Sequence, residues 1–258
     1  GSISLGTGAA SSGDGILQVT RADFITGSYT DPTDDYGHEA TVTDNSMYGI
    51  TMVSGTLSEN TTWTAGNSPY LLTGDVTIPA YITLTIEPGV IVRILKRTDD
   101  QSSGHDYNRC ELYIEDDGTL VAEGTATDSI YFMSNAESPA KSDWYGISVE
   151  NNASFDLRMS YVSFSNSVRG IAASNYYNDI YVNGDEGDTL SITNSSFRNI
   201  DDRFFYCTLN ISKGLVLIKN NKFSKWDSNF FYYVETRSNS LFHLDSIPIS
   251  DIRKYITL

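Results

Sequence analysis

Residues 190–197, with the sequence Leu-Ser-Ile-Thr-Asn-Ser-Ser-Phe, combine two alternating apolar residues, a polar residue and a phenylalanine three positions later. The same pattern occurs at residues 157–164 and 216–223. Its three phenylalanines are spaced 33 and 26 residues apart, and they are Phe164, Phe197 and Phe223. In a strand, alternation places the two apolar side chains on one face. A single copy cannot bury that face alone, so the copies are expected to stack on one another.

The repeat predicts an all-β solenoid. Its spacing suits coils of roughly 20–35 residues, and no segment sustains a helical apolar pattern. We therefore expect a right-handed parallel β-helix. Asn194 and Asn220 are predicted to lie at equivalent corners, where Asn tolerates a left-handed backbone and can hydrogen-bond to its stacked neighbour. Turn asparagines in a β-sandwich are the alternative interpretation.

Two regions differ in texture. Residues 1–54 are rich in Gly, Ser, Thr and Asp and are predicted to form an N-terminal cap or attachment segment with two or three strands. A flexible linker at the extreme N-terminus is the alternative. Residues 55–258 contain short strands separated by Gly, Asn and Asp, and they are predicted to form the β-helix.

The chain is acidic, with a formal net charge of -16. Phosphate backbones and anionic membranes would be repelled at long range, so nucleic acid is excluded as a partner, and polyanionic sugars are disfavoured unless Ca²⁺ intervenes. No run of 18 apolar residues is present, so we expect no membrane insertion. The sequence reads as a mature or excised ectodomain.

The two cysteines, Cys110 and Cys207, have no zinc-ligand spacing. The sequence allows two alternatives, one disulfide between them or two separate buried thiols.

Several short motifs carry a family resemblance. They include Leu84-Thr85-Ile86-Glu87-Pro88-Gly89-Val90, Asp117-Gly118-Thr119-Leu120 and Asp143-Trp144-Tyr145-Gly146. Residues 55–134 thereby resemble the opening coils of secreted, pectate-lyase-like right-handed parallel β-helix proteins of the surface or adhesin type. With the phenylalanine repeats, the resemblance covers about two-thirds of the chain. It implies a secreted or cell-surface location, and a fold shared by adhesins, carbohydrate-binding modules and lyases. Trp63 and Trp144 are expected to pack at coil edges.

One segment departs from this family pattern. Residues 95–107 form a polar insertion where a short strand is expected. A long loop on a rigid solenoid can carry specificity, and it is equally a place where a solenoid tolerates extra residues.

No catalytic residue is assigned. The resemblance to lyases implies a cation held by acidic residues on neighbouring coils, with an Arg or Lys nearby as the base. The sequence contains four acidic doublets that could supply such ligands, Asp34-Asp35, Asp99-Asp100, Asp116-Asp117 and Asp201-Asp202. They do not occupy matching positions in the repeats, so solvated acidic turns are the favoured interpretation. We expect no cofactor other than a possible Ca²⁺, and enzyme activity is less favoured than binding.

Three aromatic clusters are the candidate binding residues. Because neighbouring residues of a strand point to opposite faces, each cluster is expected to expose at least one ring for stacking on sugars or for a protein contact. The binding residues predicted are Tyr176, Tyr177, Phe204, Tyr206, Phe231, Tyr232 and Tyr233. Loops covering these rings are the alternative.

The sequence thus favours a surface module for adhesion, which binds a polysaccharide or a cell-surface protein. A self-assembling subunit of an extracellular filament or layer and a Ca²⁺-dependent polysaccharide lyase are the alternative functions.

Overall fold

The structure is a computed structural model of the chain. The residues that it describes are 28–30, 39–41, 49–150, 154–173, 179–182, 189–202, 204–211, 215–224, 231–236, 241–244 and 256–257. The chain divides into two compact units, Gly1–Gly49 and Ile50–Leu258. In the first unit, β1 (Ser28–Thr30) pairs antiparallel with β2 (Glu39–Thr41).

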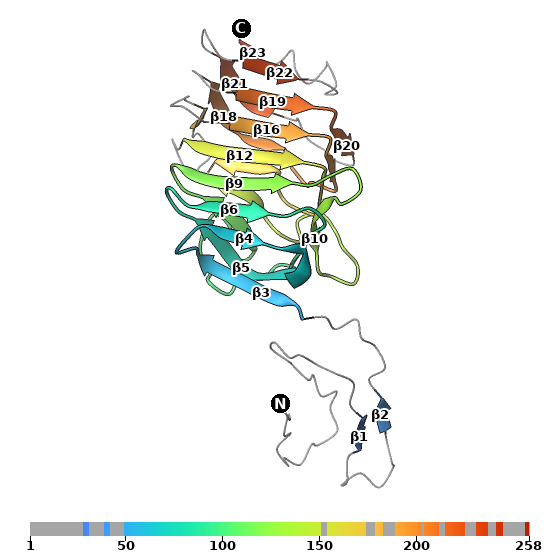
Figure 1. Ribbon diagram of the computed structural model, residues 1–258. Helices are drawn as coiled ribbons and strands as arrows, with labels where there is room; N and C mark the ends of the chain where they lie inside the picture. Colours follow the sequence, from blue (N-terminus) through green and yellow to red (C-terminus); the bar gives the residue numbers. More distant parts are fainter. Residues whose placement is uncertain are drawn as a thin grey trace. The chain divides into compact units, whose positions relative to one another are not determined.

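The second unit is a parallel β-helix whose coils pass through three sheets (Figure 1). Sheet 1 contains β7 (Ile91–Ile94), β10 (Ile130–Ser134), β13 (Val162–Ser165), β17 (Ser196–Arg198) and β20 (Lys222–Ser224). Sheet 2 contains β8 (Glu111–Ile114), β11 (Gly146–Val149), β14 (Ile171–Ala173), β18 (Phe205–Ile211), β21 (Phe231–Thr236) and β23 (Ile256–Thr257). Sheet 3 contains β4 (Thr61–Trp63), β6 (Thr83–Ile86), β9 (Gly118–Glu123), β12 (Phe155–Ser160), β16 (Thr189–Thr193), β19 (Leu215–Lys219) and β22 (Leu241–Leu244). All the strand pairs within these sheets are parallel, which confirms the predicted fold.

Sheets 1 and 2 are continuous through one long strand, β5 (Tyr70–Ile78). Its first part pairs with β7 and its last part with β8. Along its opposite edge, β5 pairs with β3 (Thr51–Thr56). A further strand, β15 (Asp179–Val182), pairs with β18. Among the described residues, the only helical segment is a short 3-10 turn, Ala65–Asn67, and no helix is long and apolar enough to cross a membrane.

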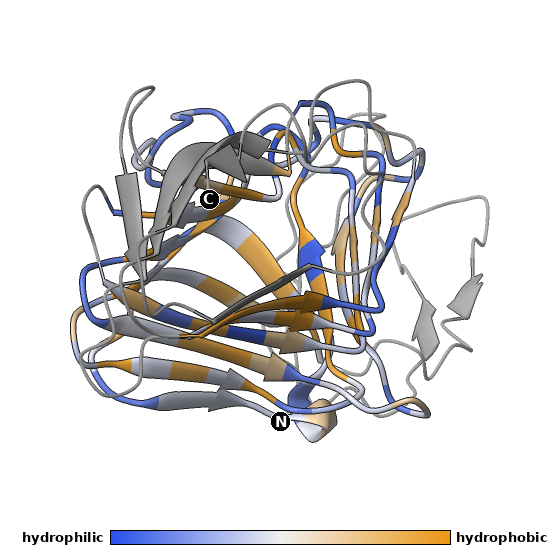
Figure 2. Cartoon of the chain, turned by 90° about the horizontal axis from the view of Figure 1, so that it is seen from above, coloured by the Kyte–Doolittle hydropathy of each residue, from blue (hydrophilic) through white to orange (hydrophobic). Residues whose placement is uncertain are grey.

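The phenylalanine repeat sets the register of the coils. Phe164 pairs with Phe197 in sheet 1, and Phe197 pairs with Phe223. Their ring centroids lie 5.7 Å and 5.1 Å apart, inside the coil. Phe132, one coil earlier, lies 6.0 Å from Phe164. The predicted column of stacked rings is therefore present. Figure 2 shows that hydrophobic and hydrophilic residues alternate along many of the strands around the coil.

Both tryptophans expected to pack are in the core. Trp63 is 3% exposed and stacks on Tyr70, with centroids 4.8 Å apart. Trp144 is fully buried against Phe164, and its indole N–H donates to the Ser165 carbonyl at 2.8 Å. Burial of the rings stabilises the coil, while the hydrogen bond satisfies the one polar group of Trp144.

The corner after sheet 3 is a single residue in the left-handed region. The φ angles of Tyr161, Asn194 and Asn220 are 49°, 50° and 57°. The repeat thus places its polar residue at the corner of three successive coils, as predicted for the two asparagines.

Cys110 is a free, buried thiol. Of the two states considered for this cysteine, the structure has the unpaired one. Burial raises the pKa of the Cys110 thiol to about 12. Cys207 lies in β18, and its side chain is outside the described part of the chain.

Candidate functional site

Two of the coils have extra length in the connection from sheet 1 to sheet 2. Residues 95–110 connect β7 to β8, and residues 135–145 connect β10 to β11. In the next two coils the same connection takes residues 166–170 and 199–204. The polar insertion identified in the sequence is therefore the longest of a stacked set of loops at one corner.

The insertion covers the outer face of sheet 2. Val76 and Leu112 are core residues, so their strand neighbours Asp75 and Glu111 lie on the outer face, where parallel pairing puts them side by side. Nevertheless these two carboxyl groups are only 2% and 0% exposed. Residues of the insertion contact both and exclude solvent from them.

Asp75 is held by two hydrogen-bond partners. Its Oδ1 accepts the backbone N–H of Glu111 at 2.9 Å, and its Oδ2 accepts the Ser103 hydroxyl at 2.7 Å. The loop around Ser103 is shaped in turn by Asp99, whose carboxylate accepts the N–H groups of Gln101 and Ser103 at 3.0 Å and 2.8 Å. One buried carboxyl thus joins the insertion to the sheet.

Glu111 makes the second connection. Its Oε1 accepts the backbone N–H of His105 in the insertion, and its Oε2 accepts the hydroxyl of Ser148 on the next strand, β11. Gly104 lies directly above: a Cβ there would overlap Glu111 Oε1 and would lie 2.7 Å from Asp75 Oδ2. Only a residue without a side chain fits at this point, and its φ of 64° also favours glycine.

Burial changes the acidity of both groups. Desolvation, reinforced by the charges of Asp75 and Asp106, raises the pKa of Glu111 to about 8. Desolvation, reinforced by the charge of Asp99, raises the pKa of Asp75 to about 6. Glu111 is therefore protonated at neutral pH. Because no surface reaches its carboxyl group, this acid fastens the loop and is not placed to act on a substrate.

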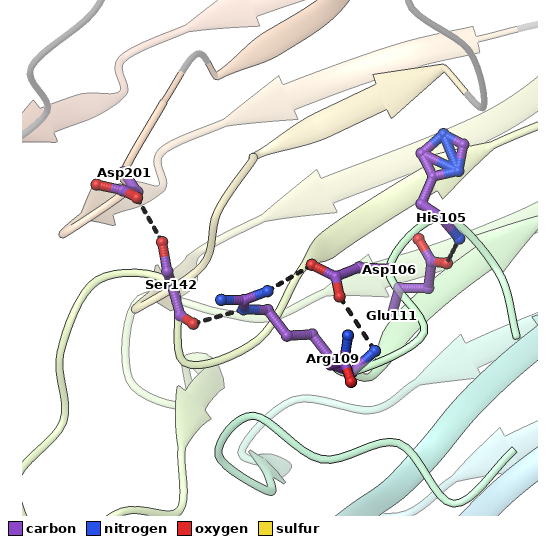
Figure 3. A network of polar contacts seen from close by, with 7 residues as sticks. His105, Asp106, Arg109, Glu111, Ser142 and Asp201 are labelled. Carbon is purple, nitrogen blue, oxygen red and sulfur yellow. Dashed lines mark hydrogen bonds and ion pairs between the residues drawn. The ribbon is translucent and has the colours of Figure 1, made fainter. Parts of the chain in front are cut away.

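A second polar network links the insertion to the loops of the next coils (Figure 3). Arg109 pairs with Asp106 at 2.6 Å, and its Nε donates to the Ser142 carbonyl at 2.8 Å. The Ser142 hydroxyl donates to Asp201, which belongs to the loop two coils beyond that of Ser142. Partly buried polar contacts of this kind favour one arrangement of the stacked loops.

The upper side of the insertion is exposed. Tyr107 is 65% exposed, while the neighbouring His105 ring packs edge-on against Tyr145 at 5.4 Å. Burial and the charge of Arg169 lower the pKa of His105. Arg169 also forms an ion pair with Asp202. The corner therefore presents one exposed tyrosine on a fixed polar base.

The predicted aromatic binding residues fall into three groups. Tyr176 and Tyr177 lie outside the described residues. Tyr206 belongs to β18, and Phe231, Tyr232 and Tyr233 belong to β21, but their side chains are outside the described part. Phe205 pairs with Phe231, which brings two of the three clusters together on sheet 2. On the preceding coil, Tyr206 pairs with Ala172.

Phe204 was predicted to bind a ligand, and that prediction is wrong. Its ring is 2% exposed and packs edge-on against Phe197 and Phe223, with centroids 4.5 Å and 5.1 Å away. Phe204 precedes β18 and so is not governed by strand alternation. It fills the interior beside the phenylalanine column.

The described acidic doublets serve local structure. Asp99 shapes the insertion, Asp201 accepts from Ser142, and Asp202 pairs with Arg169. Among the described residues, no three acidic, His or Cys side chains converge as metal ligands do. The residues that organise this corner, Asp75 and Glu111, were not singled out in the sequence. The available signal was an acidic residue directly beside the apolar run of a strand.

The comparisons with known proteins concern the part of the chain that contains this corner. The model of one family, described as a pectate-lyase-like beta helix domain, matches residues 55–200, which is more than half of the chain. The match begins within β3 and ends after β17, and it includes the insertion. Comparisons with curated proteins and with solved structures found no match.

Proposed function

The chain belongs to the pectate-lyase-like beta-helix family, and we propose that it is an extracellular surface module that mediates adhesion. In this proposal a rigid β-helix displays aromatic residues of the insertion and of sheet 2 to a polysaccharide or a cell-surface partner. Binding is favoured over catalysis because the most perturbed acids of the corner, Asp75 and Glu111, are both sealed from solvent.

The observation that carries the proposal is the fixed insertion. Asp75 and Glu111 fasten the loop from below, and Arg109 joins it to the neighbouring coil. A loop held in one conformation loses little entropy on binding, which is the condition for a useful recognition surface. At its exposed side Tyr107 offers a ring face of the kind that stacks on sugars.

Sheet 2 supports the same conclusion. Its strands β18 and β21 contain the sequences Phe205-Tyr206 and Phe231-Tyr232-Tyr233 in paired register, on coils that follow the insertion. An extended glycan that crosses successive coils meets strands at intervals of about 4.8 Å, comparable to the length of one sugar residue. Several weak contacts can then add along the chain of a polymer.

The test is retention of the full chain on a panel of insoluble neutral and acidic polysaccharides. Tyr107→Ala and the pair Tyr232→Ala with Tyr233→Ala are expected to weaken retention, each ring contributing about 1 kcal/mol or a fivefold loss. Tyr161→Asn is the control, because Tyr161 is a partly exposed tyrosine at the corner after sheet 3, where the next two coils have asparagine with a similar φ angle. No retention of the unaltered chain on any polymer, or equal loss with Tyr161→Asn, would contradict the proposal.

A further inference from the structure

The outer face of sheet 1 is cationic in a strongly acidic chain. Its five strands, β7, β10, β13, β17 and β20, contain no Asp or Glu, although the chain has 33 acidic residues. They contain three cations, Arg93, Arg198 and Lys222, and all three are exposed. Charge is therefore segregated: the chain has a net charge of -16, yet every charged side chain of these five strands is positive.

The same face exposes large apolar side chains. Ile50, Met52 and Tyr131 are 47%, 47% and 42% exposed. The register puts Met52 beside Leu71, and Leu71 beside Arg93, in one row. Tyr131 pairs with Ile91 in the next row. An apolar patch flanked by charges of one sign is typical of a surface that is covered by a partner.

A complementary surface lies at the corner between sheets 2 and 3, which we call the acidic ridge. This is the one corner that sheet 1 does not share. Its carboxylates come from three of four successive connections, and they are Glu59, Glu115, Asp116, Asp117 and Glu150. The described residues of these connections, 57–60, 79–82, 115–117 and 150, contain no Lys or Arg.

The acidic ridge is rigid and includes an exposed aromatic ring. The N–H of Asp116 donates to Glu150 at 3.0 Å, and Asp116 accepts the N–H of Ser154 at 2.8 Å. Tyr81 is 81% exposed, and a hydrogen bond to Asp117, together with the charge of that carboxylate, raises the pKa of its phenol. The ridge thus offers fixed carboxylates and one ring, where sheet 1 offers cations and apolar side chains.

We propose that the cationic face of sheet 1 binds the acidic ridge of a second copy of this chain. Each copy carries both surfaces on opposite sides of the coil, so the contact is heterologous and can extend to a third copy and beyond. Side-by-side assembly of β-helices goes beyond the proposed adhesive function and does not depend on it. It would array many weak ligand sites on one surface.

Ionic strength should affect this contact in a particular way. Two copies with a charge of -16 repel each other when the screening length is about 30 Å, at about 0.01 M salt. At about 0.15 M salt the screening length is about 8 Å, so the distant charges are screened while the facing charges still attract. At about 1 M salt these attractions are screened as well. Association is therefore expected to be strongest at intermediate salt.

The experiment is sedimentation equilibrium of the full chain at about 0.15 M salt, at concentrations up to the order of 1 mM. Concentration-dependent association is expected. The face-reversed variant Arg93→Glu with Lys222→Glu, and the ridge-reversed variant Glu59→Lys with Glu115→Lys, should each weaken it at least tenfold. Lys219→Glu is the matched control for Lys222→Glu, because Lys219 is an exposed lysine on sheet 3. It changes the net charge by -2, as Lys222→Glu does alone, and should have no effect beyond twofold, whereas Lys222→Glu alone should weaken association by more than that.

Mixing the two reversed variants provides the decisive result. The reversed face of one then meets the reversed ridge of the other, so association should return in the mixture although each variant alone associates at least tenfold more weakly than the unaltered chain. A monomeric unaltered chain at all concentrations, equal loss with Lys219→Glu, or no recovery on mixing would overturn the proposal. Capture of an acidic polysaccharide by sheet 1 in a chain that stays monomeric would also overturn it.

Discussion

The side-chain amide of Asn220 donates to Oδ1 of Asn194 across 3.2 Å, joining the corners of two successive coils. Both residues have a left-handed backbone, and Asn194 also donates its backbone N–H to the Lys219 carbonyl at 3.0 Å. The hydrogen bond between the two side chains therefore acts at a point of each coil where the backbone conformation is unfavourable for most other residues.

Replacement of Asn194 should separate the contribution of its side-chain hydrogen bond to stability from that of its left-handed backbone conformation. Asn194→Ala loses the side-chain hydrogen bond and puts a Cβ residue at a φ of 50°, so we expect a loss of about 1–2 kcal/mol in the free energy of unfolding. Asn194→Gly loses the hydrogen bond but relieves the backbone, and its loss should be less than about 1 kcal/mol. Urea unfolding measures both. A larger loss for glycine than for alanine would contradict this account.

The loss in the free energy of unfolding when a phenylalanine of the column is replaced by alanine should depend on how deeply its ring is buried. Phe197 is 1% exposed and contacts Phe164, Phe204 and Phe223, so Phe197→Ala should cost about 3–5 kcal/mol. Phe223 is only partly buried, and Phe223→Ala should cost clearly less. Thermal and urea unfolding compare the two variants. Equal losses would show that the column does not stabilise the fold as its packing suggests.

The column was predictable because it depends on local pattern. Strand alternation fixes which side chains point inward, and the spacing of Phe164, Phe197 and Phe223 fixes how coils align. The corner asparagines follow from the same register. The position of the insertion was also predictable, since it interrupts a strand pattern.

The interior of the corner was not predictable, because it depends on contacts distant in sequence. Asp75 and Glu111 are neighbours only through the register of β5 and β8, and the fold of residues 99–105 decides their burial. Alternation likewise could not reveal that Phe204, which lies outside a strand, turns inward.

The buried acid Glu111 should make stability depend on pH. Its pKa rises from an ordinary 4.5 to about 8 on folding, so between these values the folded chain binds a proton that the unfolded chain does not. Stability therefore falls as pH rises through this window, by at most about 1.4 kcal/mol per pH unit, and the loss is complete above the folded pKa. Asp75 adds to the fall up to pH about 6.

Glu111→Gln isolates this effect. The amide oxygen can accept the His105 N–H, and the amide N–H can donate to the Ser148 hydroxyl oxygen in place of the bond that Glu111 accepts from that hydroxyl, so the variant should fold. Between pH about 6 and about 8 its urea midpoint should be nearly constant, whereas that of the unaltered chain falls. Parallel curves for the two proteins would mean that Glu111 does not carry the pH dependence.

A methyl group at Gly104 should release the insertion. Both Gly104 and Gly89 have positive φ angles, 64° and 81°, so alanine is strained by the backbone at either position. They differ in space: a Cβ at Gly104 overlaps Glu111 Oε1, whereas at Gly89 the nearest atom, Cβ of Asp128, is 3.8 Å away. The two substitutions therefore share one cost, and only Gly104→Ala adds a clash with a buried carboxyl group.

Gly104→Ala is expected to expose residues 99–108 to limited proteolysis and to return the pKa of Glu111 toward 4.5 as water reaches its carboxyl group. Gly89→Ala should lower stability by about 1 kcal/mol and leave the insertion protected. Cleavage sites read by mass spectrometry, and urea midpoints between pH about 5 and about 9, distinguish these outcomes. If both variants keep the insertion protected and retain the pH dependence of the unaltered chain, the carboxyl pair is not what fastens the loop. If both lose protection equally, backbone strain and not the clash at Glu111 accounts for the release.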